Sequence, residues 1–335
     1  MKMRENIEFG TTIALWGQCA DRFLSQGYKK DTSFKEKIEL ISKVDDMKGV
    51  DLYGDWDVNM DNVGEVDNVL KEYGLKAFIV TADVASLPEF GRGSVTSPVK
   101  EHRELAGKKI REAIDIAEIL DCPMINLWLG QDGYDYSFQS DYLWGWQQII
   151  DSISQAADYA GSKNIKIALE YKPREPRTHL FTASVTSMLM VVTKVNRDNV
   201  GVLIDTGHAY IAGENIAESV AVCSMNDDKL FYVHVNDNYK VWDDDMMVGS
   251  IHPFEMLEFL YWLEKTGYSG PIVLDMFPYR EDPLGAARES VEFIKQMREI
   301  LKNIDEKEIE EIMKSQDAVK AMNMIRKNFI RNIKT

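Results

Sequence analysis

Short apolar runs alternate with longer segments of helical periodicity along almost the whole chain. We predict strands at Ile7–Leu15, Val50–Tyr53, Ala77–Thr81, Met124–Leu129, Ile165–Tyr171, Val200–Asp205, Leu230–Val235 and Ile272–Phe277. Segments of helical spacing include Lys35–Val44, Glu65–Glu72, Val99–Leu120, Leu143–Ala160, Ile216–Val222, Pro253–Thr266 and Leu284–Leu301. Strands that are apolar on both faces indicate a parallel sheet covered by helices.

Repetition of this strand–helix unit over about 300 residues favours an α/β fold of the (β/α)8 TIM-barrel type over an open doubly wound sheet. No strand is followed by a G-x-G-x-x-G or G-K-[ST] motif, which argues against a nucleotide-binding fold. No Pro- or Ser-rich linker divides the chain. We therefore expect residues 1–302 to form a single catalytic barrel domain.

Residues 303–335 fall outside the repeated units and form a predicted C-terminal helical extension. Apolar positions such as Ile309, Ile312, Val319, Ile325 and Phe329 recur there at helical spacing, which predicts one or two amphipathic helices. The extension would pack either on its own barrel or on another subunit. The second alternative predicts an oligomer.

Composition narrows the class of partner. The net charge of −16 argues against a nucleic-acid or anionic-membrane partner, because neither would meet a basic surface. Cys19, Cys122 and Cys223 are scattered and suit neither a disulfide framework nor a metal-type spacing. The polar N-terminus lacks the apolar segment of a signal peptide. These features predict a cytoplasmic protein.

Ionisable residues collect where the predicted strands end. Strand five ends in Glu170 and Lys172, strand six in Asp205 and His208, strand seven in His234, Asn236 and Asp237, and strand eight in Asp275. In a barrel, the carboxyl ends of the strands form the catalytic face. These side chains are therefore expected to converge on one small volume.

A divalent cation explains this convergence, because burial of isolated carboxylates is otherwise costly. Glu170, Asp205, His234 and Asp275 offer three hard oxygen ligands and one imidazole nitrogen. Such a set suits one divalent cation, Mn²⁺ in first place, with Mg²⁺, Co²⁺ and Zn²⁺ as alternatives. Taken singly, a strand-end Asp is more often a helix cap and a lone His more often a core residue. Their joint occurrence on consecutive strands predicts a metal site.

Several segments resemble those of xylose isomerases and of the wider family of xylose isomerase-like barrels, which includes ketose 3-epimerases. The segments are "ALEYKPREPR", "LIDTGHAYIAG", "KVWDDDMMVG", "VLDMFPYRED" and "INLWLGQDGYD". The resemblance runs from about residue 124 to residue 282. It implies a divalent cation bound by Glu170, Asp205, His234 and Asp275.

The resemblance also implies roles for residues around that cation. Lys172 would contact substrate oxygen near the reacting carbons, and Trp16 and Trp128 would form aromatic walls of a sugar pocket. His208, with Asp243 and Asp245, would serve a second cation in the xylose isomerase arrangement. From its position after the E-P-R loop, His179 is expected to reach a ligand.

Two departures from the family pattern matter. The second strand region, "VDLYGDWDV", lacks the His-Asp pair that opens the sugar ring in xylose isomerases, and Asn236 stands where a metal-binding acid is expected. The second departure favours one metal ion over two. In addition, Asp275 is one methylene shorter than the Glu of the 3-epimerases, which argues against a symmetric two-base epimerase.

We therefore expect a metal-dependent sugar isomerase or epimerase that abstracts a proton next to a sugar carbonyl and proceeds through an enediolate. Glu170 and Asp275 would exchange the proton, Lys172 would meet the developing oxyanion, and His208 would hold a hydroxyl. The alternative is a lyase, the α-subunit of a C-glycoside deglycosidase, which acts on 3-oxo-glycosides together with a small β-subunit. A metal-dependent endonuclease fits the net charge poorly. A non-catalytic sugar-binding barrel has no need of paired carboxylates around a cation.

Overall fold

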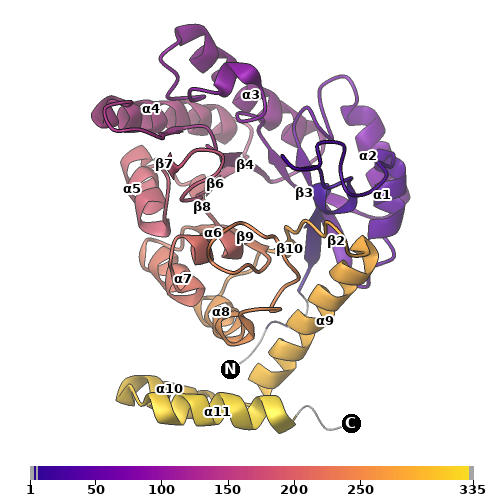
Figure 1. Ribbon diagram of the computed structural model, residues 1–335, viewed down its shortest axis with the longest axis vertical. Coiled ribbons are helices and arrows are strands. Elements are labelled where there is room, and N and C mark those ends of the chain that lie inside the picture. The colour runs from indigo at the N-terminus through magenta and orange to yellow at the C-terminus, as the bar shows by residue number, and fades with distance from the viewer. Residues whose placement is uncertain (1–3, 5–6, 332–335) are drawn as a thin grey trace.

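The computed structural model, which describes residues 4 and 7–331, is a closed parallel barrel surrounded by helices (Figure 1). Its strands are β1 (Phe9–Thr12), β2 (Met47–Tyr53), β3 (Lys76–Thr81), β4 (Met124–Trp128), β6 (Lys166–Glu170), β8 (Val200–Asp205), β9 (Leu230–Val235) and β10 (Ile272–Leu274). They close in the order β1-β10-β9-β8-β6-β4-β3-β2. The predicted TIM barrel is confirmed.

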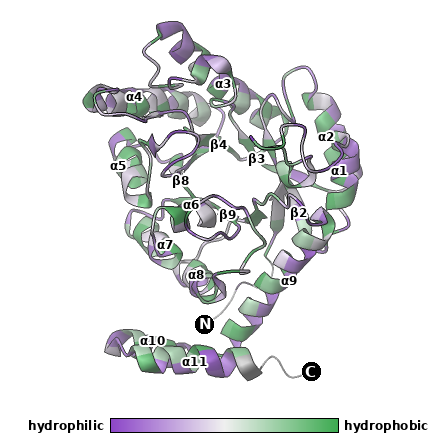
Figure 2. Cartoon of the chain, in the orientation of Figure 1, coloured by the Kyte–Doolittle hydropathy of each residue, from purple (hydrophilic) through white to green (hydrophobic). Residues whose placement is uncertain are grey.

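Helices fill the connections between the strands. They are α1 (Phe34–Ile41), α2 (Val63–Glu72), α3 (Lys100–Ile119), α4 (Tyr142–Gly161), α5 (Val185–Val195), α6 (Thr206–Ile211), α7 (Ile216–Met225), α8 (Pro253–Thr266) and α9 (Pro283–Lys302). Figure 2 shows apolar and polar residues sharing each of these helices, as expected for helices with one face on a barrel and the other in solvent. No helix among the described residues is long and apolar enough to cross a bilayer.

Several elements differ from the sequence-based expectation, among them β1, β10 and α5. β1 ends at Thr12, and a 3₁₀ turn (Ala14–Trp16) replaces the rest of the predicted first strand. β10 ends at Leu274, so Asp275 lies just beyond the strand. Helix α5 was not predicted, because its sequence VTSMLMVVTKV is rich in β-branched residues. Its start is fixed by a capping box in which Ser184 accepts from the backbone N–H of Ser187.

The barrel interior is filled by side chains and is not a channel. Phe78, Met124, Leu203, Tyr232 and Val273 belong to one buried cluster inside the ring of strands. At the amino ends of the strands, a cavity of about 1050 Å³ opens to solvent, with Tyr232 in its lining. The ionisable residues at the carboxyl ends of the strands do not line this cavity. The candidate site therefore lies at the other end of the barrel.

The C-terminal extension forms α10 (Glu306–Ser315) and α11 (Ala318–Arg331), which lie side by side at the bottom of Figure 1. Ile309 and Ile312 of α10 are buried. The ring of Phe329 on α11 packs edge-on against Phe254 of α8 at 4.9 Å between centroids. The extension thus packs on its own barrel. Docking on a second subunit stays a prediction.

Candidate metal centre

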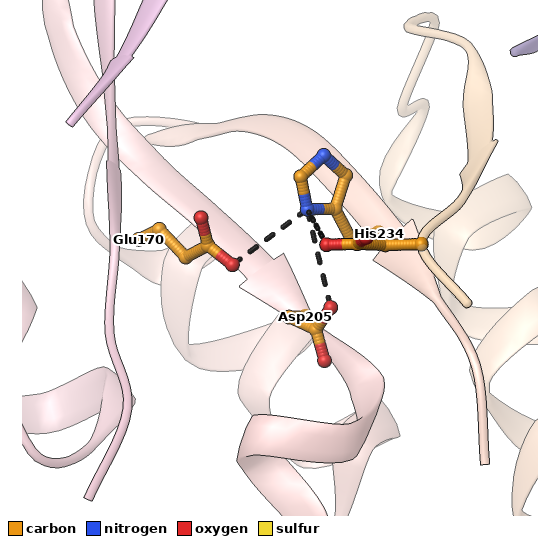
Figure 3. Close-up of side chains that lie close together, drawn as sticks. Glu170, Asp205 and His234 are labelled. Carbon is orange, nitrogen blue, oxygen red and sulfur yellow. Dashed lines mark ion pairs between the residues drawn. The ribbon is translucent and has the colours of Figure 1, made fainter. Parts of the chain in front are cut away.

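Glu170, Asp205, His234 and Asp275 meet at the carboxyl ends of the strands. Each offers one ligand atom, and these atoms all lie within 4.8 Å of one another. Figure 3 shows Glu170 and Asp205 directed towards the same ring nitrogen of His234. The first three residues are buried, whereas the side chain of Asp275 is 22% exposed. The four side chains therefore surround a volume suited to one cation.

Strand ends and their neighbours set the positions of the carboxylates. Glu170 is the last residue of β6, and the amide of Asn126 on β4 donates to its Oε2 at 2.6 Å. Asp205 ends β8 and is also the N-cap of α6, where its Oδ1 accepts from the backbone N–H of His208 at 3.0 Å. The hydroxyl of Thr12 donates to Oδ1 of Asp275 at 3.1 Å. Each carboxylate therefore keeps an oxygen directed into the cluster.

The imidazole of His234 is at the centre of the group. Its Nδ1 lies 3.2 Å from Oδ2 of Asp275, 3.6 Å from Oε1 of Glu170 and 3.9 Å from Oδ2 of Asp205. This nitrogen is buried and, among the described residues, has no partner with hydrogen-bond geometry. A ring nitrogen that faces three carboxylates without a hydrogen bond is the donor expected of a metal ligand.

The electrostatics of the cluster also fit a cation. Burial, and then the nearby charges of Asp243, Asp275 and Glu170, raise the pKa of Asp205. Burial lowers the pKa of His234, but the carboxylates of Asp275, Asp51 and Glu170 outweigh it and raise that pKa well above its usual value. Carboxylates this close raise one another's pKa unless a positive charge lies between them. The residues present could thus hold a divalent metal.

A second group of ionisable residues lies beside the first and already contains a positive charge. The Lys172 ammonium is 2.7 Å from Oδ2 of Asp243, and Nε2 of His208 is 3.0 Å from the same oxygen. Burial lowers the pKa of Lys172, but Asp243, Asp245 and Glu175 raise it above its usual value, so the ammonium stays charged. His208 joins the two groups, since its Nδ1 is 3.3 Å from Oε1 of Glu170.

Asn236 acts as a hydrogen-bond donor at the position where the family pattern has an acid. Its amide donates to both oxygens of Asp205, at 3.2 and 3.1 Å, and to the backbone carbonyl of Asp275 at 2.9 Å. A donor that faces these oxygens cannot be a cation ligand through the same atom. This geometry favours one metal ion in the cluster.

The residues expected at the sugar differ in their placement. Trp128 ends β4, is partly buried, and has the Lys172 ammonium over its ring at 5.7 Å. Trp16 is 3% exposed, and its indole N–H donates to the hydroxyl of Thr11. His179 lies in the short ribbon of β5 (Gly133–Tyr134) and β7 (His179–Leu180), where its exposed ring stacks on Tyr134. Trp128 is thus the best placed of the three to meet a substrate.

Two buried residues of the site escaped sequence reasoning. Asn126 lies within β4 and orients Glu170. Asp51 lies within β2, and its Oδ2 is 2.8 Å from Nε2 of His234. Both are polar residues inside apolar strand runs, and that is a signal the sequence does carry.

Comparison with known proteins identifies the family. The family model described as the xylose isomerase-like TIM barrel matches residues 32–297. The chain belongs to this family. Xylose isomerase from Thermus thermophilus is 30% identical over 217 residues, which cover 64% of this chain and 56% of that protein. The xylose isomerase from Thermus caldophilus is 29% identical over an equal span. The chain thus matches little more than half the length of these family relatives.

Solved structures with the same fold include several sugar epimerases. A D-tagatose 3-epimerase-like protein superposes with a TM-score of 0.69 at 22% identity, covering 88% of this chain and 98% of that one. D-allulose 3-epimerase from Methylomonas sp. gives 0.69 at 21% identity, with 89% and 99% covered. The 3-keto-D-glucoside 4-epimerase of E. coli gives 0.68 at 18% identity, with 87% and 99% covered. At these identities the likeness shows the shared fold.

Proposed function

We propose that this family member is a divalent-metal-dependent isomerase or epimerase of sugars that transfers a proton at the carbon beside a carbonyl. The observation that carries the proposal is the convergence of Glu170, Asp205, His234 and Asp275, whose ligand atoms lie within 4.8 Å of one another. When bound, a divalent cation in such a site stabilises the negative charge that develops on a substrate carbonyl oxygen. Mn²⁺ is the ion that we propose for it.

Asp275 is the better placed of the two candidate proton carriers. Its side chain is 22% exposed, whereas that of Glu170 is 6% exposed and held at Oε2 by Asn126. A group that exchanges a proton with substrate has to lie within hydrogen-bond reach of it. We therefore assign the first proton transfer to the Asp275 carboxylate. Glu170 would hold the ion, and the enediolate would regain a proton either from the carboxylic acid formed at Asp275 or from a protonated Glu170 on the opposite face.

Lys172 and His208 would act on the substrate oxygens. The Lys172 ammonium is fixed by Asp243 and keeps its charge, so it supplies a preorganised positive group for an oxyanion. Nδ1 of His208 lies 3.3 Å from Oε1 of Glu170 but has no partner with hydrogen-bond geometry among the described residues, so it would hydrogen-bond a substrate hydroxyl. Trp128 would pack against the sugar from the side of β4.

The sequence and contacts of β2 indicate which class of sugar the protein would accept. This strand lacks the His-Asp pair expected of a ring-opening xylose isomerase, and its Asp51 contacts His234 instead. A 3-oxo-glycoside already carries a free ketone outside its anomeric centre and needs no ring opening, so the lack of that pair favours oxo-glycosides. The E. coli enzyme of similar fold is named for a 3-keto-D-glucoside. This observation keeps the second candidate, a lyase of 3-oxo-C-glycosides working with a small second subunit.

The test is hydrogen exchange in D₂O. Protein loaded with Mn²⁺ is incubated with ketohexoses and with 3-oxo-glycosides, and products are read by NMR and mass spectrometry. Deuterium beside the carbonyl of an intact sugar supports the isomerase or epimerase, and released aglycone supports the lyase.

A matched pair of variants links the exchange to the cluster. Asp275→Asn removes the proposed proton carrier, whereas Asp237→Asn changes a buried carboxylate of the β9–α8 loop that holds His252. We expect a loss of exchange of about 10²–10⁴-fold in the first variant, the usual contribution of a positioned acid or base. Absence of exchange with every substrate in a metal-loaded, folded protein would falsify the proposal.

A further inference from the structure

Asp51 is a buried carboxylate that is not one of the four cluster residues. It lies in β2 and is 4% exposed. In the closed ring, β2 is separated from β9 by β1 and β10 on one side and by β3, β4, β6 and β8 on the other. Its contact with His234 of β9 therefore crosses the interior of the barrel and is not a contact between adjacent strands.

Both oxygens of Asp51 are held by side chains of the same strand. Oδ2 lies 2.8 Å from Nε2 of His234, and Oδ1 accepts from the hydroxyl of Tyr232 at 2.6 Å. Tyr232 and His234 are two residues apart in β9, so both point to the same face of that strand. The carboxylate consequently has one orientation relative to the imidazole.

This orientation decides which nitrogen of His234 faces the cluster. An ionised carboxylate only accepts hydrogen bonds, so the proton must be on Nε2. When a cation takes the place of the proton that the carboxylates favour on Nδ1, this nitrogen, 3.2 Å from Asp275 and 3.6 Å from Glu170, can present its lone pair to the volume between the carboxylates. Without Asp51 the neutral ring is free to carry its proton on Nδ1, where that proton would block the ligand atom.

A purely structural role accounts poorly for Asp51. Within the described residues, no Lys or Arg forms an ion pair with it, and its partners are His234 and Tyr232. Burial of a carboxylate without a full countercharge is costly, and apolar side chains usually fill such a position with greater stability. Carboxylates that accept a hydrogen bond from the far nitrogen of a metal-binding His are a recurrent way to orient that ligand.

We propose that Asp51 is a positioning residue that fixes the tautomer and the ring orientation of His234 for cation binding through Nδ1. This inference rests on the proposed metal site. It adds a residue of β2 to that site and defines the role of Tyr232, which holds the carboxylate in place.

The first test uses the intact wild-type chain. Protein with ¹⁵N-labelled His is loaded with diamagnetic Zn²⁺, and the ring nitrogens of His234 are observed by long-range ¹H–¹⁵N NMR. His234→Gln assigns the signals. We expect the metal on Nδ1 and a proton on Nε2. A metal-bound Nε2, or a proton on Nδ1, overturns the inference.

The second test measures Mn²⁺ affinity by calorimetry. Asp51→Asn keeps the shape of the side chain and removes its charge, and we expect the affinity to fall by about 10–100-fold. The matched control is Asp132→Asn, which alters a second buried carboxylate, 0% exposed, whose partners are Ser94 and Thr96. We expect the control to bind Mn²⁺ as the wild type does.

The outcomes distinguish the proposed role of Asp51 from the proposed metal site. If the wild type binds one Mn²⁺ and Asp51→Asn binds it equally well, the role of Asp51 is wrong and the metal site stands. If the wild type binds no Mn²⁺ or Zn²⁺ at all, both are wrong. Melting temperatures measured without metal show whether each variant is folded, and the NMR result on the wild type does not depend on any variant.

Discussion

The ammonium of Lys172 lies 2.7 Å from Oδ2 of Asp243, and both side chains are buried beside the candidate metal cluster. This pair places a charge of the protein itself where the xylose isomerase pattern has a second cation. Because the carboxylates around it raise the pKa of Lys172, the residue is a fixed cation and not a proton carrier.

Removal of the Lys172 charge should allow a second cation to bind beside Asp243 and Asp245. In Lys172→Met the carboxylates of Asp243 and Asp245 lose their countercharge, and breaking a buried pair in this way costs about 3–5 kcal/mol. We expect a loss of this size in urea unfolding of the metal-free protein. We also expect the Mn²⁺ stoichiometry to rise from one to two in calorimetry. Lys172→Arg is the control that keeps the charge, and unchanged stability and stoichiometry in Lys172→Met would contradict the prediction.

Binding of a cation should stabilise the fold. A ligand at about 100 times its Kd adds about 2.7 kcal/mol to the free energy of unfolding, because it binds the folded state alone. For a domain of this size, that corresponds to a rise in Tm of about 4 °C. The measurement is differential scanning calorimetry with Mn²⁺ and after treatment with EDTA.

Asp205→Asn is the control for this measurement. Asparagine caps helices as well as aspartate does, so α6 should be retained while the charged ligand is lost. We expect Mn²⁺ to leave the Tm of this variant unchanged. An equal rise in Tm in the variant and in the wild type would place the stabilising ion elsewhere.

Asp57 should make stability depend on pH. Burial raises the pKa of Asp57 to about 6, from a usual value of 3.8. Between about pH 4 and pH 6 the folded state therefore keeps a proton that the unfolded chain has lost. The resulting contribution to stability is fully present below about pH 4 and is lost as the pH rises through about 6. Two pKa units correspond to about 3 kcal/mol, an upper limit for this partly exposed residue.

Asp57→Asn removes this titration. The difference in free energy of unfolding between the variant and the wild type should shift in favour of the variant as the pH rises from 4 to 6. Urea denaturation at several pH values measures this difference. The exposed residue Asp61 supplies the control variant, Asp61→Asn, which should leave the free energy of unfolding within about 0.5 kcal/mol of the wild-type value. Parallel stability curves for Asp57→Asn and the wild type would contradict the prediction.

Two glycine-to-alanine substitutions should change the free energy of unfolding in opposite directions. A Cβ on Gly49 of β2 would lie 2.5 Å from ring atoms of Phe78 inside the barrel, so Gly49→Ala should lower the free energy of unfolding by about 1–3 kcal/mol. A Cβ on Gly64 of α2 would meet no atom within 4 Å, and Gly64→Ala should raise it by about 0.5–1 kcal/mol. Chemical denaturation of both variants measures the contrast, and a change of the same sign in both would contradict it.

The barrel and the four cluster residues could be predicted because their signals are local. Glu170 and Asp205 each end an apolar strand, His234 is the penultimate residue of another, and Asp275 directly follows one, so the carboxyl ends of the strands bring them together. The sequence showed no comparable signal for pairings across the barrel. Asp51 and His234 are 183 residues apart, and nothing local to either marks the other as its partner.

Local chemistry also misled at α5. α5 has the β-branched composition of a strand, and its capping box and the packing of its apolar face decide for the helix. His179 follows the E-P-R loop closely in sequence, but that loop leads it into an exposed ribbon beside Tyr134. Its proposed contact with substrate would need another part of the ligand to extend to that ribbon.

Asp205 has two roles, as the N-cap of α6 and as a member of the cluster, because both use the same carboxylate. A descendant of this protein that abandoned metal chemistry would still favour an aspartate there to start the helix. Retention of Asp205 in a lineage therefore says little about catalysis. Glu170 and His234 have no such helix-starting duty, and their replacement would mark the lineages in which the activity has been lost.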